Sequence, residues 1–261
     1  MNFKEKIAKT AKERESRIIL ALDLPPEKPS KAIFSKALNI LDETQEYICA
    51  VKINRQLILP LGLFGETQKI LSAAKNYGLL LIMDCKINDV GHTNQAIAEY
   101  YFEAGFDAVT ANPFVGWEEG LKSVFEIAHR NGKGVILLVY MSHKGASEGY
   151  GQIVKDSKTG DLVSQYQIFA RKAVEWNADG VVVGATYPEK IAEVKQIVKD
   201  KIPIYSPGVG FQGGKIEETV KAGADYLIVG RSIILAKKPA EAAEEIRNTA
   251  NTVKFPQKDF S

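Results

Sequence analysis

The stretch LLLIMDCKINDV, residues 79–90, is a continuous apolar run that ends in charged side chains. Apolar runs of this length are typical of strands buried on both faces, as in parallel sheets. Because side chains alternate along a strand, Asp84 and Lys86 share the face of Ile82. Asp89 falls three residues further on, in the expected loop. The stretch therefore predicts a buried parallel strand whose carboxyl end carries charge.

Seven further apolar runs have a strand-like composition, and a segment with helical spacing separates each from the next. The segment 65–78, for example, places Ile70, Leu71 and Ala74 on one flank. Strict alternation of strands and helices is typical of parallel sheets, and eight strands is the number that closes an α/β fold into a (β/α)8 TIM barrel. A doubly wound open sheet is the alternative. The eight runs are 17–24, 47–54, 79–86, 108–114, 134–141, 180–186, 204–210 and 226–232.

Composition and charge argue against several classes of protein. Lys and Arg number 34 and Asp and Glu number 32, a formal net charge of +2, so no overall field favours nucleic acid or an anionic membrane. No apolar run approaches the roughly 18 residues needed to cross a bilayer, and the charged segment 1–17 lacks the apolar core of a signal peptide. Cys49 and Cys85 lie in apolar stretches, as expected of reduced thiols in a cytoplasmic protein.

No linker, low-complexity tract or break in composition divides the chain, so residues 1–261 are interpreted as one domain. Near its start, Phe3, Ile7 and Ala11 have the spacing of an amphipathic helix, which we expect to cap the bottom of that domain. One connection is unusually long, because residues 143–164 are polar and glycine-rich. The segment follows the fifth predicted strand, so it is either a mobile lid over a barrel active site or a solvated surface insertion.

Charged side chains end three consecutive predicted strands. The alternation that aligns Asp84 with Lys86 also places Lys52 on the inward face of the second strand and Asp23 on that of the first. In a closed barrel these side chains converge on the mouth, within reach of one small ligand. An ion-pair ring that closes the barrel is the structural alternative, but desolvated ion pairs stabilise weakly, which favours a functional site.

The mixture of lysines and carboxylates indicates a type of chemistry. Opposite charges that lie side by side keep one another ionised. A lysine held as an ammonium is a proton donor, and a carboxylate held ionised repels a second carboxylate that binding elsewhere forces beside it. These properties suit a reaction in which a substrate loses carbon dioxide and the resulting carbanion is protonated.

A second candidate site lies in SPGVGFQGGK, residues 206–215, whose glycines spell G-x-G-x-x-G. The motif comes too late in the chain for a dinucleotide fold, and Ile216 stands where a P-loop has Ser or Thr. In barrels, the loops after strands seven and eight commonly hold a phosphate. Gly230 and Arg231, at the end of the eighth strand, would add close backbone approach and a bidentate guanidinium. Ordinary turn glycines are the alternative.

Several of these stretches together resemble the orotidine 5′-phosphate decarboxylase family, the last enzyme of de novo UMP synthesis, and the resemblance covers essentially the whole chain. Its most specific part is the Asp-x-Lys-x-x-Asp signature with a lysine on the preceding strand. The resemblance implies a decarboxylase that uses no metal and no organic cofactor. The stretches are LALDL at 20–24, VKIN at 51–54, DCKINDVGHT at 84–93, YMSHKGA at 140–146, SPGVGFQGG at 206–214 and IVGRSI at 228–233.

The resemblance also implies roles for individual residues. Lys86 would donate the proton and Asp84 would lie beside the departing carboxylate, in a charged tetrad completed by Lys52 and Asp89. Asp89 and Thr93 would reach the active site of a partner subunit, which implies a homodimer. Besides Lys52 and Thr93, the substrate-binding residues would be Asp23 for the ribose, Ser142 for the pyrimidine, and Pro207, Gly208, Gln212, Gly230 and Arg231 in the phosphate loops.

Two departures from the family pattern are mild: Val90 replaces the usual isoleucine, and Gly91 stands where many members have proline. Two other functions stay open. A related barrel enzyme that forms a metal-stabilised enediolate from sugar phosphates shares the signature, but it has a carboxylate near the position of Lys52. A nucleotide-phosphate sensor would need the phosphate loops without the tetrad. The three histidines show no metal-ligand spacing and are expected on the surface or in loops; they are His92, His129 and His143.

Overall fold

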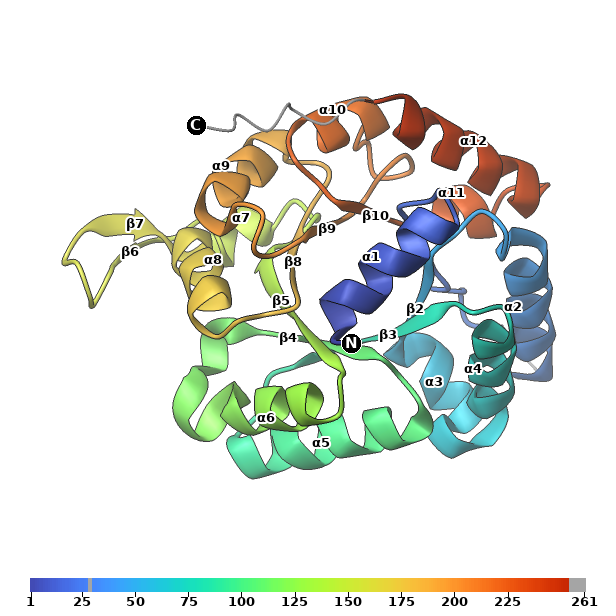
Figure 1. Cartoon of the computed structure of the whole chain (residues 1–261), viewed down its shortest axis with the longest axis horizontal. Coiled ribbons are helices and arrows are strands. Elements are labelled where there is room, and N and C mark those ends of the chain that lie inside the picture. Colours follow the sequence, from blue (N-terminus) through green and yellow to red (C-terminus); the bar gives the residue numbers. More distant parts are fainter. Residues whose placement is uncertain (28–29, 254–261) are drawn as a thin grey trace.

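The computed structural model describes residues 1–27 and 30–253, so residues 28–29 and 254–261 of the predicted domain lie outside it. Eight parallel strands of the described chain form a closed barrel surrounded by helices (Figure 1), which confirms the TIM barrel and rules out the open sheet. Pairing of the first barrel strand with the last closes the ring. The barrel strands are β1 (Ile18–Ala21), β2 (Ala50–Asn54), β3 (Leu80–Ile87), β4 (Ala108–Ala111), β5 (Gly134–Tyr140), β8 (Gly180–Val183), β9 (Ile204–Pro207) and β10 (Tyr226–Val229).

Helices connect the strands around the outside of the barrel, as the spacing of apolar residues predicts. In α4, Ile70, Leu71 and Ala74 are buried on one side. The helical segments are α1 (Phe3–Glu13), α2 (Ser30–Thr44), α3 (Arg55–Leu61), η1 (Gly62–Glu66), α4 (Thr67–Asn76), α5 (Gly91–Ala104), η2 (Pro113–Val115), η3 (Trp117–Leu121), α6 (Lys122–Arg130), α7 (Ala146–Gly149), α8 (Gln165–Glu175), α9 (Pro188–Val198), α10 (Ile216–Lys221), α11 (Arg231–Ile234) and α12 (Pro239–Thr252).

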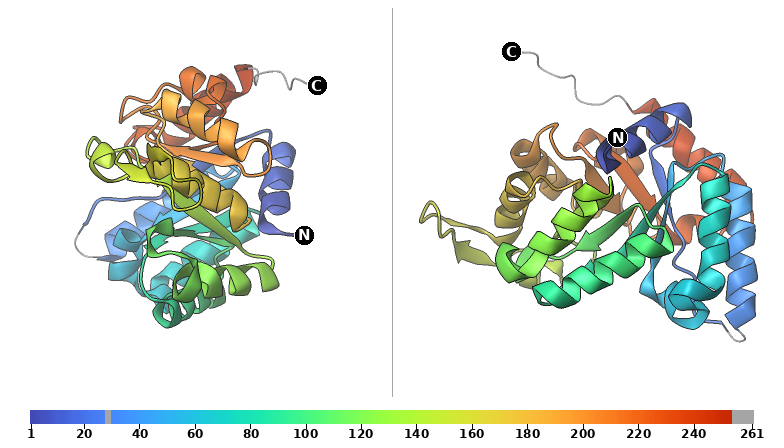
Figure 2. Two further views of the ribbon diagram at one scale, coloured as in Figure 1. Left: turned by 90° about the vertical axis from the view of Figure 1, so that its left-hand side faces the viewer. Right: turned by 60° about the horizontal axis from the view of Figure 1, so that its bottom comes forward.

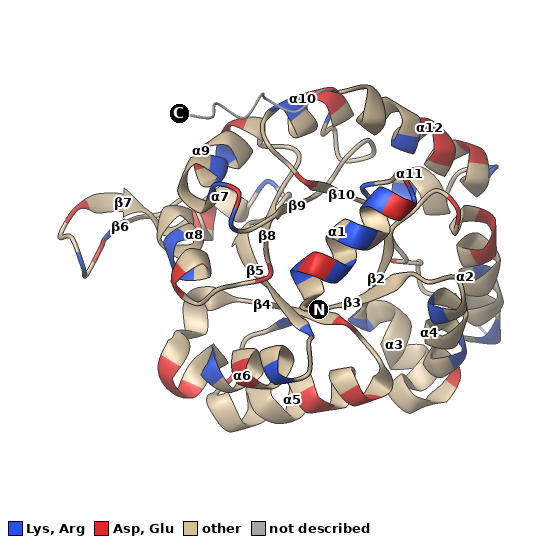
Figure 3. Cartoon of the chain, viewed as in Figure 1, with Lys and Arg blue, Asp and Glu red and all other residues tan. Residues whose placement is uncertain are grey.

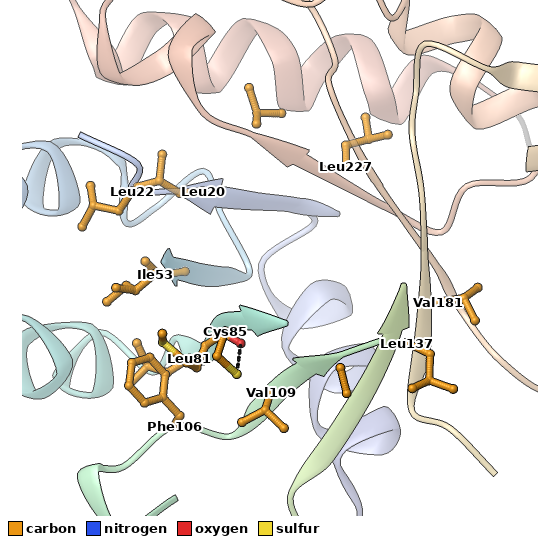
Figure 4. Packing of buried hydrophobic residues seen from close by; sticks show 14 of the residues in the cluster. Leu20, Leu22, Ile53, Leu81, Cys85, Phe106, Val109, Leu137, Val181 and Leu227 are labelled. Atoms are coloured by element: carbon orange, nitrogen blue, oxygen red, sulfur yellow. Dashed lines mark hydrogen bonds between the residues drawn. The ribbon is translucent and has the colours of Figure 1, made fainter. Parts of the chain in front are cut away.

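Alternation along the strands divides the core into two layers. Ile19 and Ala21 of β1 belong to the cluster inside the barrel, whereas Leu20 and Leu22 belong to the larger cluster between strands and helices. Figure 4 shows side chains of that outer layer on several neighbouring strands. Inward positions near the carboxyl ends of the strands are therefore free for functional side chains.

Helix α1 closes the opposite end of the barrel. Its first turn carries a capping box between Asn2 and Glu5. Phe3 and Ile7 are fully buried and join the cluster inside the barrel, and Figure 1 shows the helix lying across the opening. The Phe3 ring packs directly against the backbone of Gly134, the first residue of β5, where an added Cβ would lie 2.5 Å from the ring. The expected amphipathic cap is confirmed.

Residues 143–164 differ from the irregular connection that their composition indicates. They contain the short helix α7 and an antiparallel hairpin of β6 (Ile153–Lys155) and β7 (Leu162–Ser164). Figure 1 and the right panel of Figure 2 show this hairpin projecting away from the barrel. The segment is thus a structured surface insertion.

The charged residues are spread over the outer surface. Figure 3 shows Lys and Arg interspersed with Asp and Glu along the outer helices. Among the helices described for residues 1–27 and 30–253, none is long and apolar enough to cross a membrane. The barrel mouth is a separate case, because charged side chains there lie within the fold.

Candidate active site

A cavity of about 490 Å³ opens at the carboxyl ends of the barrel strands. Its walls come from strand ends and from the loops that follow them, and its floor is formed by inward apolar side chains of the barrel. It brings together ten of the twelve residues predicted for the site. These are Asp23, Lys52, Asp84, Lys86, Ser142, Pro207, Gly208, Gln212, Gly230 and Arg231.

Lys52 is the buried centre of the charged group. Its Nζ donates to Asp84 Oδ2 at 2.8 Å and to Asp23 Oδ2 at 3.2 Å, and its side chain is 6% exposed. Burial alone would lower the pKa of Lys52, but the charges of Asp84 and Asp23 outweigh burial and raise that pKa. The lysine is therefore a fixed cation that joins the ends of three strands.

Asp84 accepts hydrogen bonds from three side chains. Lys86 Nζ donates to Oδ1 at 2.7 Å, Thr110 Oγ1 donates to the same oxygen at 3.0 Å, and Lys52 occupies Oδ2. Burial would raise the pKa of the Asp84 carboxyl, but Lys52 and Lys86 outweigh burial and hold that pKa well below its usual range. Asp84 is thus a permanent carboxylate facing the cavity.

Lys86 lies at an irregular point of β3. The pairing of β3 with β4 shifts register between Met83 and Ile87, and Lys86 has φ 50°, which non-glycine residues rarely adopt. Its side chain nevertheless faces the cavity, as the sequence pattern predicts. The ammonium of Lys86 is more exposed than that of Lys52, so it is the cation of the pair that a ligand can approach.

The loops after β9 and β10 form the other side of the cavity. Gly208 has φ 95°, and a Cβ there would lie 2.6 Å from Gln212 Oε1, so this position requires glycine. The Arg231 guanidinium stacks on the Phe211 ring, 4.0 Å from its centroid. The backbone N–H of Phe211 donates to Ser232 Oγ at 3.0 Å, which joins the two loops.

Asp89 and Thr93 do not line this cavity within their own chain. Asp89 is exposed in the loop after β3, and Thr93 lies in the first turn of α5. The loop is held by the buried Asn94, whose side chain accepts from the Asp89 N–H at 2.9 Å and donates to the Gly120 carbonyl at 3.0 Å. The two residues therefore lie outside the cavity that the other ten line.

Other lining residues were not identified from the sequence. Thr110 is the clearest case, since it lies at an inward position of β4 beside Asp84, and strand alternation could have revealed it. Phe211 lies between the predicted phosphate-loop residues Gly208 and Gln212, and its residue type alone gives no signal for a lining position. The residues of the floor could be assigned to the cavity only from the tertiary structure. They are Ile82, Ile136, Leu138, Val182, Tyr205 and Ile228.

The residues that were expected to be inert are mostly structural. Cys49 and Cys85 are free and buried, and burial raises the pKa of each thiol to about 12. His129 is exposed on α6, as expected, and its Nε2 also lies 3.0 Å from Asp179 Oδ2. Within the described ranges, no group of three or more His, Cys, Asp or Glu side chains is placed to hold a metal ion.

The chain matches known proteins over most of its length. The model of the family described as "Orotidine 5'-phosphate decarboxylase / HUMPS family" matches residues 16–246. The orotidine 5′-phosphate decarboxylase of Methanosarcina mazei is 38% identical over 234 residues, which cover 90% of this chain and 94% of that protein.

Two solved structures share the fold. The orotidine 5′-monophosphate decarboxylase of Methanocaldococcus jannaschii, complexed with the inhibitor BMP, superposes with a TM-score of 0.75 at 29% identity and covers 90% of this chain and 99% of its own. The UMP synthase of Leishmania donovani gives a TM-score of 0.82 at 27% identity over 97% of this chain, which spans 56% of that longer chain.

Proposed function

Because the chain belongs to the orotidine 5′-phosphate decarboxylase / HUMPS family, we propose that it converts orotidine 5′-phosphate into UMP and carbon dioxide in pyrimidine synthesis. The observation that carries this proposal is the partly buried Lys52–Asp84–Lys86 array at the mouth of the barrel. It offers a fixed carboxylate and an approachable ammonium side by side. We also propose that residues 1–261 act as one domain.

Substrate binding would use two sides of the cavity. Gln212 and Arg231, in the loops that also contain Pro207, Gly208 and Gly230, would hold the phosphate. Asp23 would bind the ribose and Ser142 the pyrimidine. This binding energy would force the substrate carboxylate against Asp84, since repulsion between the two negative charges opposes that position.

The chemical step would break the bond between the ring carbon and the carboxylate. Carbon dioxide leaves, and the electron pair stays on the ring carbon beside the Lys86 ammonium. Lys86 Nζ then transfers a proton to that carbon and regains one from water. Asp84 contributes because its low pKa keeps it charged, so repulsion in the bound substrate is relieved as the carboxylate departs.

Lys52 argues against the enediolate alternative. That chemistry needs a divalent metal held by several carboxylates near this position. Here the Lys52 ammonium lies within hydrogen-bonding distance of both Asp23 and Asp84, so a cation already occupies the place between them. A nucleotide-phosphate sensor would need only the phosphate loops, so it gives no reason for the charged tetrad. Turnover in the presence of EDTA separates both alternatives from the decarboxylase.

We propose further that the enzyme is a homodimer in which Asp89 and Thr93 serve the partner's cavity. Both residues lie outside their own site, and exposed apolar side chains lie nearby. Val90 is more than half exposed beside Asp89, and Tyr100 on α5 meets Phe64 edge to face with ring centroids 6.4 Å apart. A contact with a second subunit would bury such surface.

The first experiment follows the loss of the orotate-like ultraviolet absorbance when the enzyme is added to orotidine 5′-phosphate with EDTA present. The wild type should turn over, and Lys86→Ala should abolish turnover while it still binds UMP, because the phosphate loops are intact. Retained turnover by Lys86→Ala would contradict the assignment of the proton donor. Wild-type binding without turnover would support the sensor.

A second experiment tests the shared site. Lys86→Ala and Asp89→Ala should each be inactive alone, but a mixture allowed to exchange subunits should recover up to about a quarter of wild-type activity. This follows because half of the dimers are mixed, and each mixed dimer has one intact site. No recovery after proven exchange would place both residues in one site. Location in the cytoplasm stays a prediction, which cell fractionation tests.

A further inference from the structure

The hydroxyl of Thr110 connects β4 to both charged residues of β3. Thr110 is 3% exposed and lines the cavity. Its Oγ1 donates to Asp84 Oδ1 at 3.0 Å and accepts from the backbone N–H of Lys86 at 2.9 Å. The hydroxyl therefore uses both its hydrogen and one of its lone pairs in hydrogen bonds to the neighbouring strand β3.

This contact sits where the strand pairing is irregular. Met83 pairs with Val109 and Ile87 pairs with Ala111, so three residues of β3 lie opposite Thr110 alone. A bulge of this kind interrupts the ladder and redirects side chains. The Lys86 N–H is part of the bulge, and the Thr110 hydroxyl supplies its hydrogen-bond partner.

The backbone of Lys86 would not adopt this conformation without support. A φ of 50° is sparsely populated for a residue with a Cβ, and such conformations persist only where surrounding contacts impose them. The hydrogen bond from its N–H to Thr110 is a contact of that type. Because the side chain leaves from this backbone, the direction of the Lys86 ammonium depends on it.

We propose that Thr110 is a positioning residue for Lys86 and Asp84. Its hydroxyl holds the Lys86 backbone in the bulge and fixes Asp84 Oδ1, so that the ammonium meets the substrate carbon in one orientation. Thr110 acts through these two residues and needs no contact with the substrate. The inference rests on the proposed decarboxylation, in which Lys86 is the proton donor.

The effect should fall on the chemical step and leave binding intact. The phosphate loops after β9 and β10 would supply the affinity for the nucleotide, whereas the Thr110 hydroxyl bonds to Asp84 and to the Lys86 N–H on β3. A misplaced proton donor, by contrast, slows a reaction strongly even when the ligand binds normally. The signature of a positioning role is therefore a lower kcat with an unchanged KM.

The test uses Thr110→Val, which keeps the shape of the side chain and removes the hydroxyl. We expect kcat to fall roughly 10- to 100-fold, as for loss of a hydrogen bond to a charged group. KM and the Kd for UMP should stay within about threefold of the wild type. Thr110→Ser keeps the hydroxyl and should recover most of kcat. The matched control is Thr44→Val, a buried threonine on α2 whose Oγ1 donates to the Ile40 carbonyl at 2.7 Å.

Three results would overturn the inference: Thr110→Val with wild-type kcat, Thr110→Ser as slow as Thr110→Val, or a loss confined to KM. If Thr110→Val does not fold in thermal unfolding, Thr110→Ala and Thr110→Ser replace it, and equal kcat values for these two refute the role of the hydroxyl. A wild type without any turnover refutes the proposed function, and with it a positioning role in that reaction. An active wild type with an unimpaired Thr110→Val refutes only Thr110.

Discussion

Removal of the Lys52 ammonium should destabilise the fold strongly. Lys52→Met leaves a side chain of similar length but no charge between Asp84 and Asp23, whose carboxylates the lysine now joins at 2.8 and 3.2 Å. The lysine side chain is 6% exposed and that of Asp84 is 13% exposed, so water does little to replace the lost partner. Breaking a buried pair in this way costs about 3–5 kcal/mol of unfolding free energy.

The pH dependence of this loss has a definite sign. In the wild type the pKa of the Asp84 carboxyl is lower in the folded protein than in the unfolded chain. The carboxylate therefore stabilises the fold at any pH above its unfolded-state pKa, and this contribution is lost as pH falls through its folded-state pKa. Without Lys52, the pKa of Asp84 rises towards or above the unfolded-state value. The deficit of Lys52→Met should therefore shrink as pH falls from about 7 to about 3.5, because protonation relieves a carboxylate that has lost one of its two lysine partners.

Urea unfolding followed by circular dichroism at several pH values measures this deficit. Adding Asp84→Asn to Lys52→Met removes both buried charges and should restore most of the stability. Lys238→Met, which breaks the exposed pair with Glu241, is the control and should leave the unfolding free energy unchanged. A deficit that is absent at neutral pH, or that grows on acidification, would refute this account of the charged group.

Four further predictions concern other parts of the molecule. Arg231→Ala should raise KM for orotidine 5′-phosphate roughly 10- to 100-fold in steady-state assays, through loss of a charge-assisted phosphate contact. Phe211→Ala should raise KM only about 2- to 5-fold, because it removes the stacking partner of that guanidinium, and Phe211→Tyr should not. Phe3→Ala should lower the unfolding free energy by about 3–5 kcal/mol in denaturant titrations without changing kcat. Cys49 and Cys85 should resist a thiol reagent near pH 8 in the folded protein and react in denaturant, since each pKa is about 12; an equal reaction rate in both states would contradict this burial.

Alternation along strands predicts most of the inner face of the barrel. It places Asp23, Lys52 and Asp84 inside, and the cavity contains them. It fails for Ile48, which the same alternation would place on the face of Lys52 but which packs in the outer cluster. The reason is that β2 begins only at Ala50, so the period of two does not extend back to Ile48.

The arrangement around Lys86 could not be predicted from local sequence. A lysine gives no signal for a positive φ, which glycine and asparagine usually provide. The conformation depends on Thr110, which lies on the next strand, so only the tertiary structure contains the information. The hairpin of β6 and β7 could not be predicted for a related reason, because each strand has only three residues and pairs with the other strand and not with the barrel.

Helix α1 has a consequence for the order of events during synthesis. Phe3 and Ile7 belong to a cluster that also contains Tyr226 and Ile228 of the last barrel strand. The ribosome synthesises the helix long before that strand. The apolar side chains of α1 therefore lack part of their packing surface until the rest of the barrel has been synthesised. The lysines and glutamates around Phe3 and Ile7 should limit aggregation of residues 3–13 before the helix packs. The ring must close before this end of the barrel can be sealed, so contacts between distant parts of the chain should limit the rate of folding.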